Sequence, residues 1–271
     1  MSDVFTIVPP TQKALPIVVS VPHCGTQFPD SLRSLFRKDW QDGPDDTDWF
    51  VHRLYDFAPE MGITLIYAHY SRYVIDLNRD PESRPLYDDG RVITELVPSR
   101  TFTDEPLYVD APPSQAQIEE RKNLYYWPYH HKVKELLSGL QEEFSQVLLW
   151  DAHSIRRMVP TIRSEPFPDL ILGNQDGKTA SPVLIETAFD VLSGAENYQL
   201  SHNEPFKGGY ITRSFGAPEK GIHALQLEMA KDLYMDDTEL HYSEERATQV
   251  RELLQKTFKA LSEKLLSVSS G

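Results

Sequence analysis

Short apolar runs alternate along this chain with longer stretches in which apolar residues recur every three or four positions. Four of the short runs are typical of buried strands because each is bounded by polar or turn residues. They cover residues 17–21, 64–68, 147–150 and 224–227. The longer stretches predict helices over 49–60, 114–144, 182–192 and 243–266.

The order of these elements predicts an α/β fold with helices on both faces of a sheet. Ser114, with Gln117 three residues later, is a capping signal at the start of the longest predicted helix. No linker divides the chain, so we expect one domain over residues 1–271. Sites in such folds form at the carboxyl ends of the strands.

Charge and composition exclude several partners. The chain has 41 acidic and 27 basic residues and a formal charge of -14, which repels nucleic acid and anionic membrane surfaces. A single cysteine cannot form an internal disulfide. We found no leader segment and no apolar run long enough to span a membrane. We therefore expect a cytoplasmic protein, and the sequence does not indicate its oligomeric state.

Two predicted strands end at histidines. His23 follows the first strand, and either Asp46 or Asp48 opens the helix after that strand. His153 follows the third strand, with Asp151 two residues before it. Two histidines and a carboxylate are a common ligand set of catalytic zinc. They also suit other divalent transition metals. The alternative is that both histidines are hydrogen-bonded structural groups.

Arginines near the strand ends suggest an anionic ligand. Arg72 and Arg79 bracket an apolar stretch, Asn78 adds an amide, and Arg213 follows a pair of glycines. Forked guanidinium groups suit carboxylates, and an acidic chain needs such local charges to bind a small anionic substrate.

Structural explanations compete with this interpretation of the arginines. A buried ion pair with an aspartate can explain at least one of Arg72 and Arg79 without a substrate. Arg79 with Asp76 or Asp80 is one such pair. The glycine pair before Arg213 suggests a close backbone approach to a ligand, but a plain turn explains it almost as well.

Two further residues are candidates for the chemistry itself. Glu228 ends the fourth apolar run, where partial burial would raise its pKa toward that of a general base. A solvated carboxylate at the sheet edge is the alternative. Cys24 is a less favoured nucleophile, because it follows His23 directly and adjacent strand residues point to opposite sides.

Seven segments of the chain, taken together, resemble a known family. They are residues 20–25, 46–49, 53–57, 69–79, 149–154, 206–213 and 226–228. In this order they look like the N-formylglutamate amidohydrolases, also called N-formylglutamate deformylases of histidine degradation. The resemblance spans nearly the whole chain. It implies hydrolysis of N-formyl-L-glutamate to formate and L-glutamate, with a same-fold zinc amidohydrolase of another N-acyl amino acid or small amide as the alternative.

The resemblance also implies a fold and a set of roles. The family is similar to zinc carboxypeptidases and aspartoacylases, which have a three-layer sandwich with a mixed sheet. By this similarity, zinc would lie on His23, Asp48 and His153. The Asp-Leu-Asn-Arg motif ending at Arg79 would hold a substrate carboxylate, and its Asn78 shares that role.

The remaining implied roles concern the reaction. Glu228 would be the catalytic glutamate, Arg72 would stabilise the oxyanion, and Arg213 would be a further substrate contact. One departure is that no acid follows His23 at the spacing of the carboxypeptidase His-x-x-Glu pair. Asp48 is preferred to Asp46 as the acidic ligand because it leads into the predicted helix. Cys24 is a second departure, since we expect a small residue there in relatives.

Overall fold

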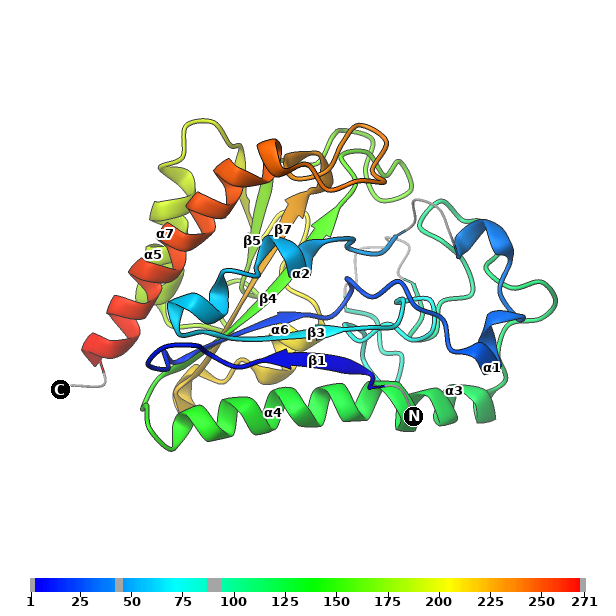
Figure 1. Cartoon of the computed structure of the whole chain (residues 1–271), viewed down its shortest axis with the longest axis horizontal. Helices are drawn as coiled ribbons and strands as arrows, with labels where there is room; N and C mark the ends of the chain where they lie inside the picture. The colour runs from blue at the N-terminus through cyan, green and yellow to red at the C-terminus, as the bar shows by residue number, and fades with distance from the viewer. Residues whose placement is uncertain (1–2, 42–45, 87–93, 269–271) are drawn as a thin grey trace.

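A mixed sheet of seven strands forms the centre of the protein (Figure 1). The computed structural model describes residues 3–41, 46–86 and 94–268. The strand order is β1-β3-β2-β4-β7-β5-β6. The inner strands β3, β2, β4 and β7 are parallel, whereas β1 and β5 run antiparallel to β3 and β7. The strands are β1 (Phe5–Val8), β2 (Ile17–Val21), β3 (Thr64–Ala68), β4 (Val147–Ile155), β5 (Leu170–Gly173), β6 (Leu200–His202) and β7 (Ile222–Ala230).

Helices and short helical turns connect the strands. None in the described part of the chain combines the length and apolar character needed to cross a bilayer. They are α1 (Asp30–Arg33), η1 (Lys38–Trp40), α2 (Val51–Leu54), η2 (Ala58–Met61), α3 (Gln115–Arg121), η3 (Lys122–Tyr126), α4 (Trp127–Gln141), α5 (Pro182–Ser193), α6 (Tyr210–Phe215), η4 (Pro218–Lys220), η5 (Lys231–Leu233) and α7 (Glu244–Val268).

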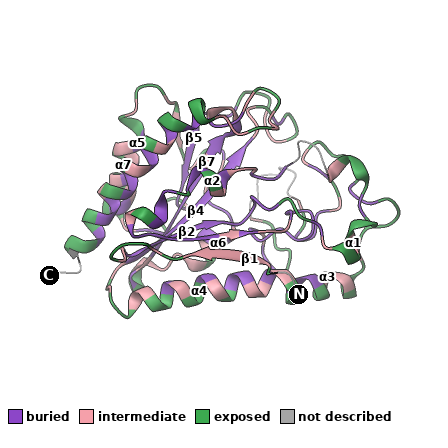
Figure 2. Ribbon diagram, viewed as in Figure 1, coloured by how far each residue is buried: buried purple, intermediate pink, exposed green. Residues whose placement is uncertain are grey.

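Helices cover both faces of the sheet, which is buried throughout its centre (Figure 2). Successive strand residues point to opposite faces. Trp150 of β4 therefore packs in one cluster with Leu184 of α5 and Phe258 of α7, while Leu149 packs in another with Val133 of α4. Burying each such side chain stabilises the fold by about 2 kcal/mol. Burial on both faces explains why these strands have continuous apolar sequences.

All four predicted strands are present, but two of them are longer than predicted. β2 and β3 match the prediction, whereas β4 continues to Ile155 and β7 covers Ile222–Ala230. His153 and Glu228 therefore lie inside strands and not after them. Their polar side chains face a cavity while their backbones keep the parallel pairing of β4 with β7. The prediction missed β1, β5 and β6.

One predicted helix is also wrong. Residues 49–60 form the single turn α2 and the 3-10 turn η2 instead of a continuous helix. Phe50 has a left-handed backbone with φ 65°, and Tyr55 ends α2 in a non-helical conformation. Pro59, which lacks a backbone N–H, lies in η2. The predictions over 182–192 and 243–266 are confirmed by α5 and α7.

The long predicted helix over 114–144 is present but contains an irregular turn. Ser114 and Gln117 form the predicted capping box at the start of α3. α3 then continues through η3, a π-helical turn, into α4. Such turns insert one residue and often lie at functional sites.

This composite helix supports the segment that precedes and includes the predicted substrate arginine. Three of its buried side chains, those of Arg121, Tyr126 and His130, donate hydrogen bonds of 3.0, 2.8 and 2.8 Å to backbone carbonyls. The accepting carbonyls are those of Val74, Arg79 and Leu77, respectively.

Candidate active site

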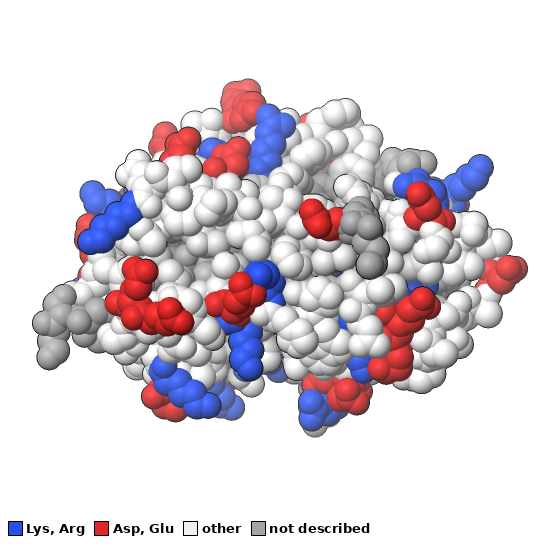
Figure 3. Space-filling view, turned by 60° about the horizontal axis from the view of Figure 1, so that its bottom comes forward, with Lys and Arg blue, Asp and Glu red and all other residues white. Residues whose placement is uncertain are grey.

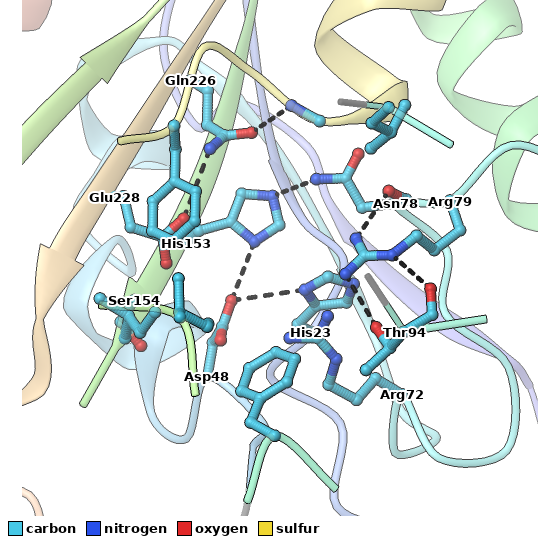
Figure 4. A pocket seen from close by; sticks show the side chains of 16 residues that line it. His23, Asp48, Arg72, Asn78, Arg79, Thr94, His153, Ser154, Gln226 and Glu228 are labelled. Atoms are coloured by element: carbon cyan, nitrogen blue, oxygen red, sulfur yellow. Dashed lines mark hydrogen bonds and ion pairs between the residues drawn. The ribbon is translucent and has the colours of Figure 1, made fainter. Parts of the chain in front are cut away.

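The carboxyl ends of three adjacent parallel strands meet at one cavity (Figure 4). His23 lies two residues after the end of β2, and His153 lies near the end of β4. Glu228 on β7 is the direct partner of His153 across the β4–β7 pair. All three line the cavity because parallel neighbours end at the same edge of a sheet.

His23, Asp48 and His153 form a compact buried group that could hold a metal ion. One ligand atom from each lies within 4.8 Å of the others. Oδ2 of Asp48 is 2.9 Å from Nδ1 of His153 and 3.7 Å from Nδ1 of His23. The other oxygen of Asp48, Oδ1, is buried without a hydrogen-bond partner among the described residues. A buried carboxylate oxygen of this kind fits a site for a cation.

Two further carboxylates orient the histidines. Nε2 of His23 lies 2.7 Å from Oδ1 of Asp76, and Nε2 of His153 lies 3.1 Å from Oδ1 of Asp151. Metal-binding histidines usually donate their second N–H to such a partner, which fixes the ring and the tautomer. Both rings therefore point Nδ1 toward Asp48, as metal ligands would.

Asp48, rather than Asp46, is the acid of this group. The backbone N–H of Asp48 donates to the carbonyl of His23 over 2.8 Å, which holds the two residues together. Oδ2 of Asp46 instead accepts the backbone N–H of Phe102 at 2.7 Å. Burial raises the pKa of Asp48, but hydrogen bonds from His153 and His23 outweigh burial and lower the pKa overall. The carboxylate is therefore ionised, as a metal ligand must be.

Glu228 has the properties of a general base. Burial raises the pKa of its carboxyl to about 7, although the nearby His153 acts in the opposite direction. Nε2 of Gln226, on the same face of β7, donates to Oε2 of Glu228 at 3.4 Å. The carboxyl faces the cavity beside the candidate metal group.

Two of the three predicted arginines reach the cavity. Arg72 is buried and pairs with Asp76 over 2.5 Å, so the structural ion pair that competed with substrate binding is present at this arginine. Arg79 lies 3.7 Å from the same aspartate and donates to the carbonyl and hydroxyl of Thr94. Asp80 pairs with Arg84 instead.

Asn78 and Arg213 make different contacts from those expected of substrate ligands. The amide of Asn78 lies on the cavity wall and is hydrogen-bonded to the protein at both ends. Arg213 is not among the described residues that line the cavity. Its guanidinium donates to the backbone carbonyls of Gly208 and Leu86, the former over 2.7 Å.

Cys24 points away from the candidate metal group. Its thiol is buried and donates to the carbonyls of Val21 and Ala68 over 3.6 and 3.5 Å. Burial raises the pKa of this thiol, which keeps it protonated. These contacts match the prediction that adjacent residues point to opposite sides.

The cavity has a volume of about 100 Å³, and the rest of its lining is mainly apolar. Such a wall excludes water and strengthens the electrostatic interactions within the site. The apolar side chains in its lining are those of Leu86, Phe102, Ile155, Ile162 and Phe206.

Sequence reasoning assigned no supporting role to Asp151, Gln226 or Asp76. Asp151 was named only as a neighbour of His153, yet the spacing of two along a strand places both side chains on one face. The same spacing relates Gln226 to Glu228. Asp76 was expected to pair with an arginine, but its contact with His23 joins segments 53 residues apart and leaves no local sequence signal.

Comparisons with known proteins identify the family of this chain. A family model described as N-formylglutamate amidohydrolase matches residues 15–235. An N-formylglutamate deformylase of Pseudomonas putida is 39% identical over 252 residues, covering 92% of this chain and 93% of that protein. A protein of the same name from Pseudomonas aeruginosa is 41% identical over 224 residues, covering 82% and 83%.

Solved structures share the fold. The crystal structure of N-formylglutamate amidohydrolase from Ralstonia eutropha JMP134 has a TM-score of 0.82 at 28% identity, covering 97% of this chain and 99% of that one. The gene product Atu2144 from Agrobacterium tumefaciens has a TM-score of 0.76 at 19% identity, covering 97% and 96%. Because the family model spans most of the chain and the curated relatives are about 40% identical, the chain belongs to the N-formylglutamate amidohydrolase family.

Proposed function

We propose that this protein hydrolyses the formamide of N-formyl-L-glutamate to formate and L-glutamate. The observation that supports this most directly is one cavity containing a potential metal group, a carboxyl with a raised pKa and two arginines. Two relatives about 40% identical are named N-formylglutamate deformylase.

The proposed cofactor is Zn²⁺ or another divalent transition metal held by His23, Asp48 and His153. Bound there, the metal would supply an acidified water molecule and polarise the formyl oxygen. The three side chains offer two imidazole nitrogens and one carboxylate, which leaves a coordination position for that water. Asp76 and Asp151 would keep both imidazole rings oriented.

Glu228 is the proposed general base and acid. Its carboxylate would accept a proton from the attacking water and return it to the amine nitrogen of the leaving glutamate. A pKa near 7 suits both steps, because the group can take up and release a proton near neutral pH.

Arg79 and Arg72 are the proposed anion-binding groups. Arg79 is the more accessible of the two, with 17% of its side chain exposed, and would bind a substrate carboxylate. Arg72 is fixed by Asp76 and by the carbonyl of Asp46, and would face the charge that develops on the formyl oxygen. For Arg213 to bind substrate, its guanidinium would have to leave the carbonyls of Gly208 and Leu86.

Several broader features remain part of this proposal. We assign the whole chain to one domain with the three-layer sandwich of zinc carboxypeptidases, acting in the cytoplasm within histidine degradation. The mixed sheet with helices on both faces supports the fold assignment. On the face shown in Figure 3, acidic side chains are interspersed with basic ones, which suits a small substrate better than a nucleic acid.

Formate release from N-formyl-L-glutamate tests the proposal. The purified protein would be assayed as prepared, after treatment with a chelator, and after zinc is added back. We expect release that the chelator abolishes and zinc restores. N-acetyl-L-glutamate and N-formyl-L-alanine test the acyl group and the side-chain carboxylate separately. A zinc-loaded protein that releases formate from neither formyl compound contradicts the proposed reaction.

A further inference from the structure

The segment 206–213 contains two adjacent glycines, Gly208 and Gly209, that have no role in the proposed reaction. At Gly209 a Cβ atom would lie 2.2 Å from the amide nitrogen of Asn78, closer than real contacts allow. Gly209 therefore has no side chain because the Asn78 amide occupies the space. The start of α6 is packed directly against a residue of the cavity wall.

Hydrogen bonds fix which way the Asn78 amide points. Its oxygen accepts the backbone N–H of Ile211 at 2.7 Å. Its nitrogen must then point into the site, where it lies 2.9 Å from Nε2 of His153 and 3.4 Å from Oδ2 of Asp151. Both ends of the Asn78 amide are therefore already hydrogen-bonded within the protein.

The same turn makes two more connections to the site. The hydroxyl of Thr212 donates to Oδ2 of Asp151 at 2.9 Å, and Asp151 holds His153. The backbone N–H of Gly209 donates to Oε1 of Gln226 at 2.7 Å, and Gln226 in turn contacts Glu228. The turn is thus linked to both the candidate metal ligand and the proposed base.

We propose that Asn78 is a positioning residue that locks this turn against Asp151, the carboxylate that orients His153, and not a substrate ligand. The proposal rests on the metal site of the proposed function. Asn78 connects the backbone N–H of Ile211 to Oδ2 of Asp151, whose Oδ1 is the partner of Nε2 of His153. Asn78 thereby holds Asp151 in the position that orients the ring with Nδ1 toward Asp48. Gly209 serves the same purpose by leaving room for the amide.

Zinc affinity separates positioning from substrate binding. Dissociation constants for zinc would be measured by competition with a chelating dye in Asn78→Ala, Gly209→Ala and the double variant. We expect each single change to weaken zinc binding by about 10- to 100-fold, as for other residues that support a metal ligand. The KM for N-formyl-L-glutamate of the zinc-loaded variants should stay within about threefold of wild type.

The double variant tests whether the two residues act together. Once Asn78 is alanine, the space beside Gly209 is open, so Gly209→Ala should add little further loss of zinc affinity. Gly139→Ala on α4, where a Cβ meets nothing within 4 Å, is the matched control and should bind zinc like wild type. Circular dichroism of the metal-free proteins would verify folding. If Asn78→Ala does not fold, the zinc affinity of Gly209→Ala tests the proposal by itself.

Three outcomes would overturn the assignment. The first is unchanged zinc affinity with a raised KM in Asn78→Ala, which would make the amide a substrate ligand. The second is wild-type affinity in Gly209→Ala. The third is a wild-type protein that takes up no zinc. A protein that binds zinc but releases no formate contradicts the proposed substrate instead, and the zinc affinities still decide the role of Asn78.

Discussion

The hydroxyl of Tyr126 donates a 2.8 Å hydrogen bond to the backbone carbonyl of Arg79. Tyr126 is buried on the helix that packs beneath the sheet, whereas the guanidinium of Arg79 reaches the cavity. The helix therefore supports the proposed carboxylate-binding arginine from outside the described lining of the cavity.

Tyr126→Phe should weaken substrate binding. A neutral hydrogen bond contributes about 1 kcal/mol, so we expect KM to rise about fivefold with kcat nearly unchanged. The adjacent Tyr125→Phe is the control, because its hydroxyl has no hydrogen bond in the described part of the chain. Equal effects of the two changes in steady-state kinetics would show that the contact with Arg79 is irrelevant to binding.

Glu228→Gln and Arg79→Ala should affect different kinetic constants. Loss of a general base typically lowers the rate 10²- to 10⁴-fold, so Glu228→Gln should act mainly on kcat. Arg79→Ala removes a charge-assisted contact and should mainly raise KM. Zinc content would be measured alongside to verify that both variants keep the metal. Similar changes of both constants in both variants would contradict these roles.

Zinc should stabilise the folded protein through Asp48. At a free zinc concentration about 100 times the dissociation constant, binding adds about 2.7 kcal/mol to the unfolding free energy. We expect added zinc to raise the Tm of the wild-type protein by at least about 5 °C. The Tm of Asp48→Ala should not change when zinc is added. Asp46→Asn keeps an oxygen for the Phe102 N–H and should respond like wild type. A response lost in Asp46→Asn and kept in Asp48→Ala would reverse the assignment.

Stability should fall in mild acid because of His130. Burial lowers the pKa of this histidine to about 4, against about 6.5 in an unfolded chain. Between pH 7 and 5 the unfolded state takes up a proton that the folded state does not. His130 alone should therefore lower the unfolding free energy by about 2 kcal/mol over this range.

Urea unfolding at several pH values measures this contribution. His130→Gln should flatten the pH dependence between 5 and 7, while the exposed neighbour His131→Gln should leave it unchanged. Parallel pH profiles for wild type and His130→Gln would mean that the acid sensitivity comes from other groups.

Cys24→Ala should leave the hydrolysis intact. The thiol is buried, its pKa is raised by burial, and it bonds to two backbone carbonyls outside the cavity. We expect kcat/KM for formate release within about twofold of wild type. Abolished turnover in a folded, zinc-loaded Cys24→Ala protein would favour a cysteine nucleophile.

The apolar pattern predicted the centre of the fold but not the extent of its strands. Runs such as 17–21 are buried on both faces, so their sequence identifies them. β4 continues past Trp150 because Asp151 and His153 keep their backbone pairing while their side chains face the cavity. Local hydropathy cannot separate such residues from a loop. The half-buried β1 and the three-residue β6 also lack a strong signal.

The candidate site was predictable where function dictates residue type. His23, Asp48 and His153 were found from strand ends and family resemblance, and the structure brings them together. The contacts of Asn78 were not predictable, since Ile211 lies 133 residues away along the chain. For Arg72, the structural and the functional interpretation both apply. It forms an ion pair with Asp76 and also lines the cavity.

The π-helical turn at Lys122–Tyr126 makes the length of this helix critical. In a regular α-helix, the positions that share a face with Arg121 are 125 and 129, whereas here they are Tyr126 and His130. Deleting one residue from the turn would restore regular geometry and rotate α4 by about 100° relative to α3. Both side chains would then leave the carbonyls of Leu77 and Arg79. The number of residues in this helix thus determines how the segment that carries Arg79 is held at the cavity. Relatives that lack one residue of the π-helical turn should therefore bind substrate with a different affinity.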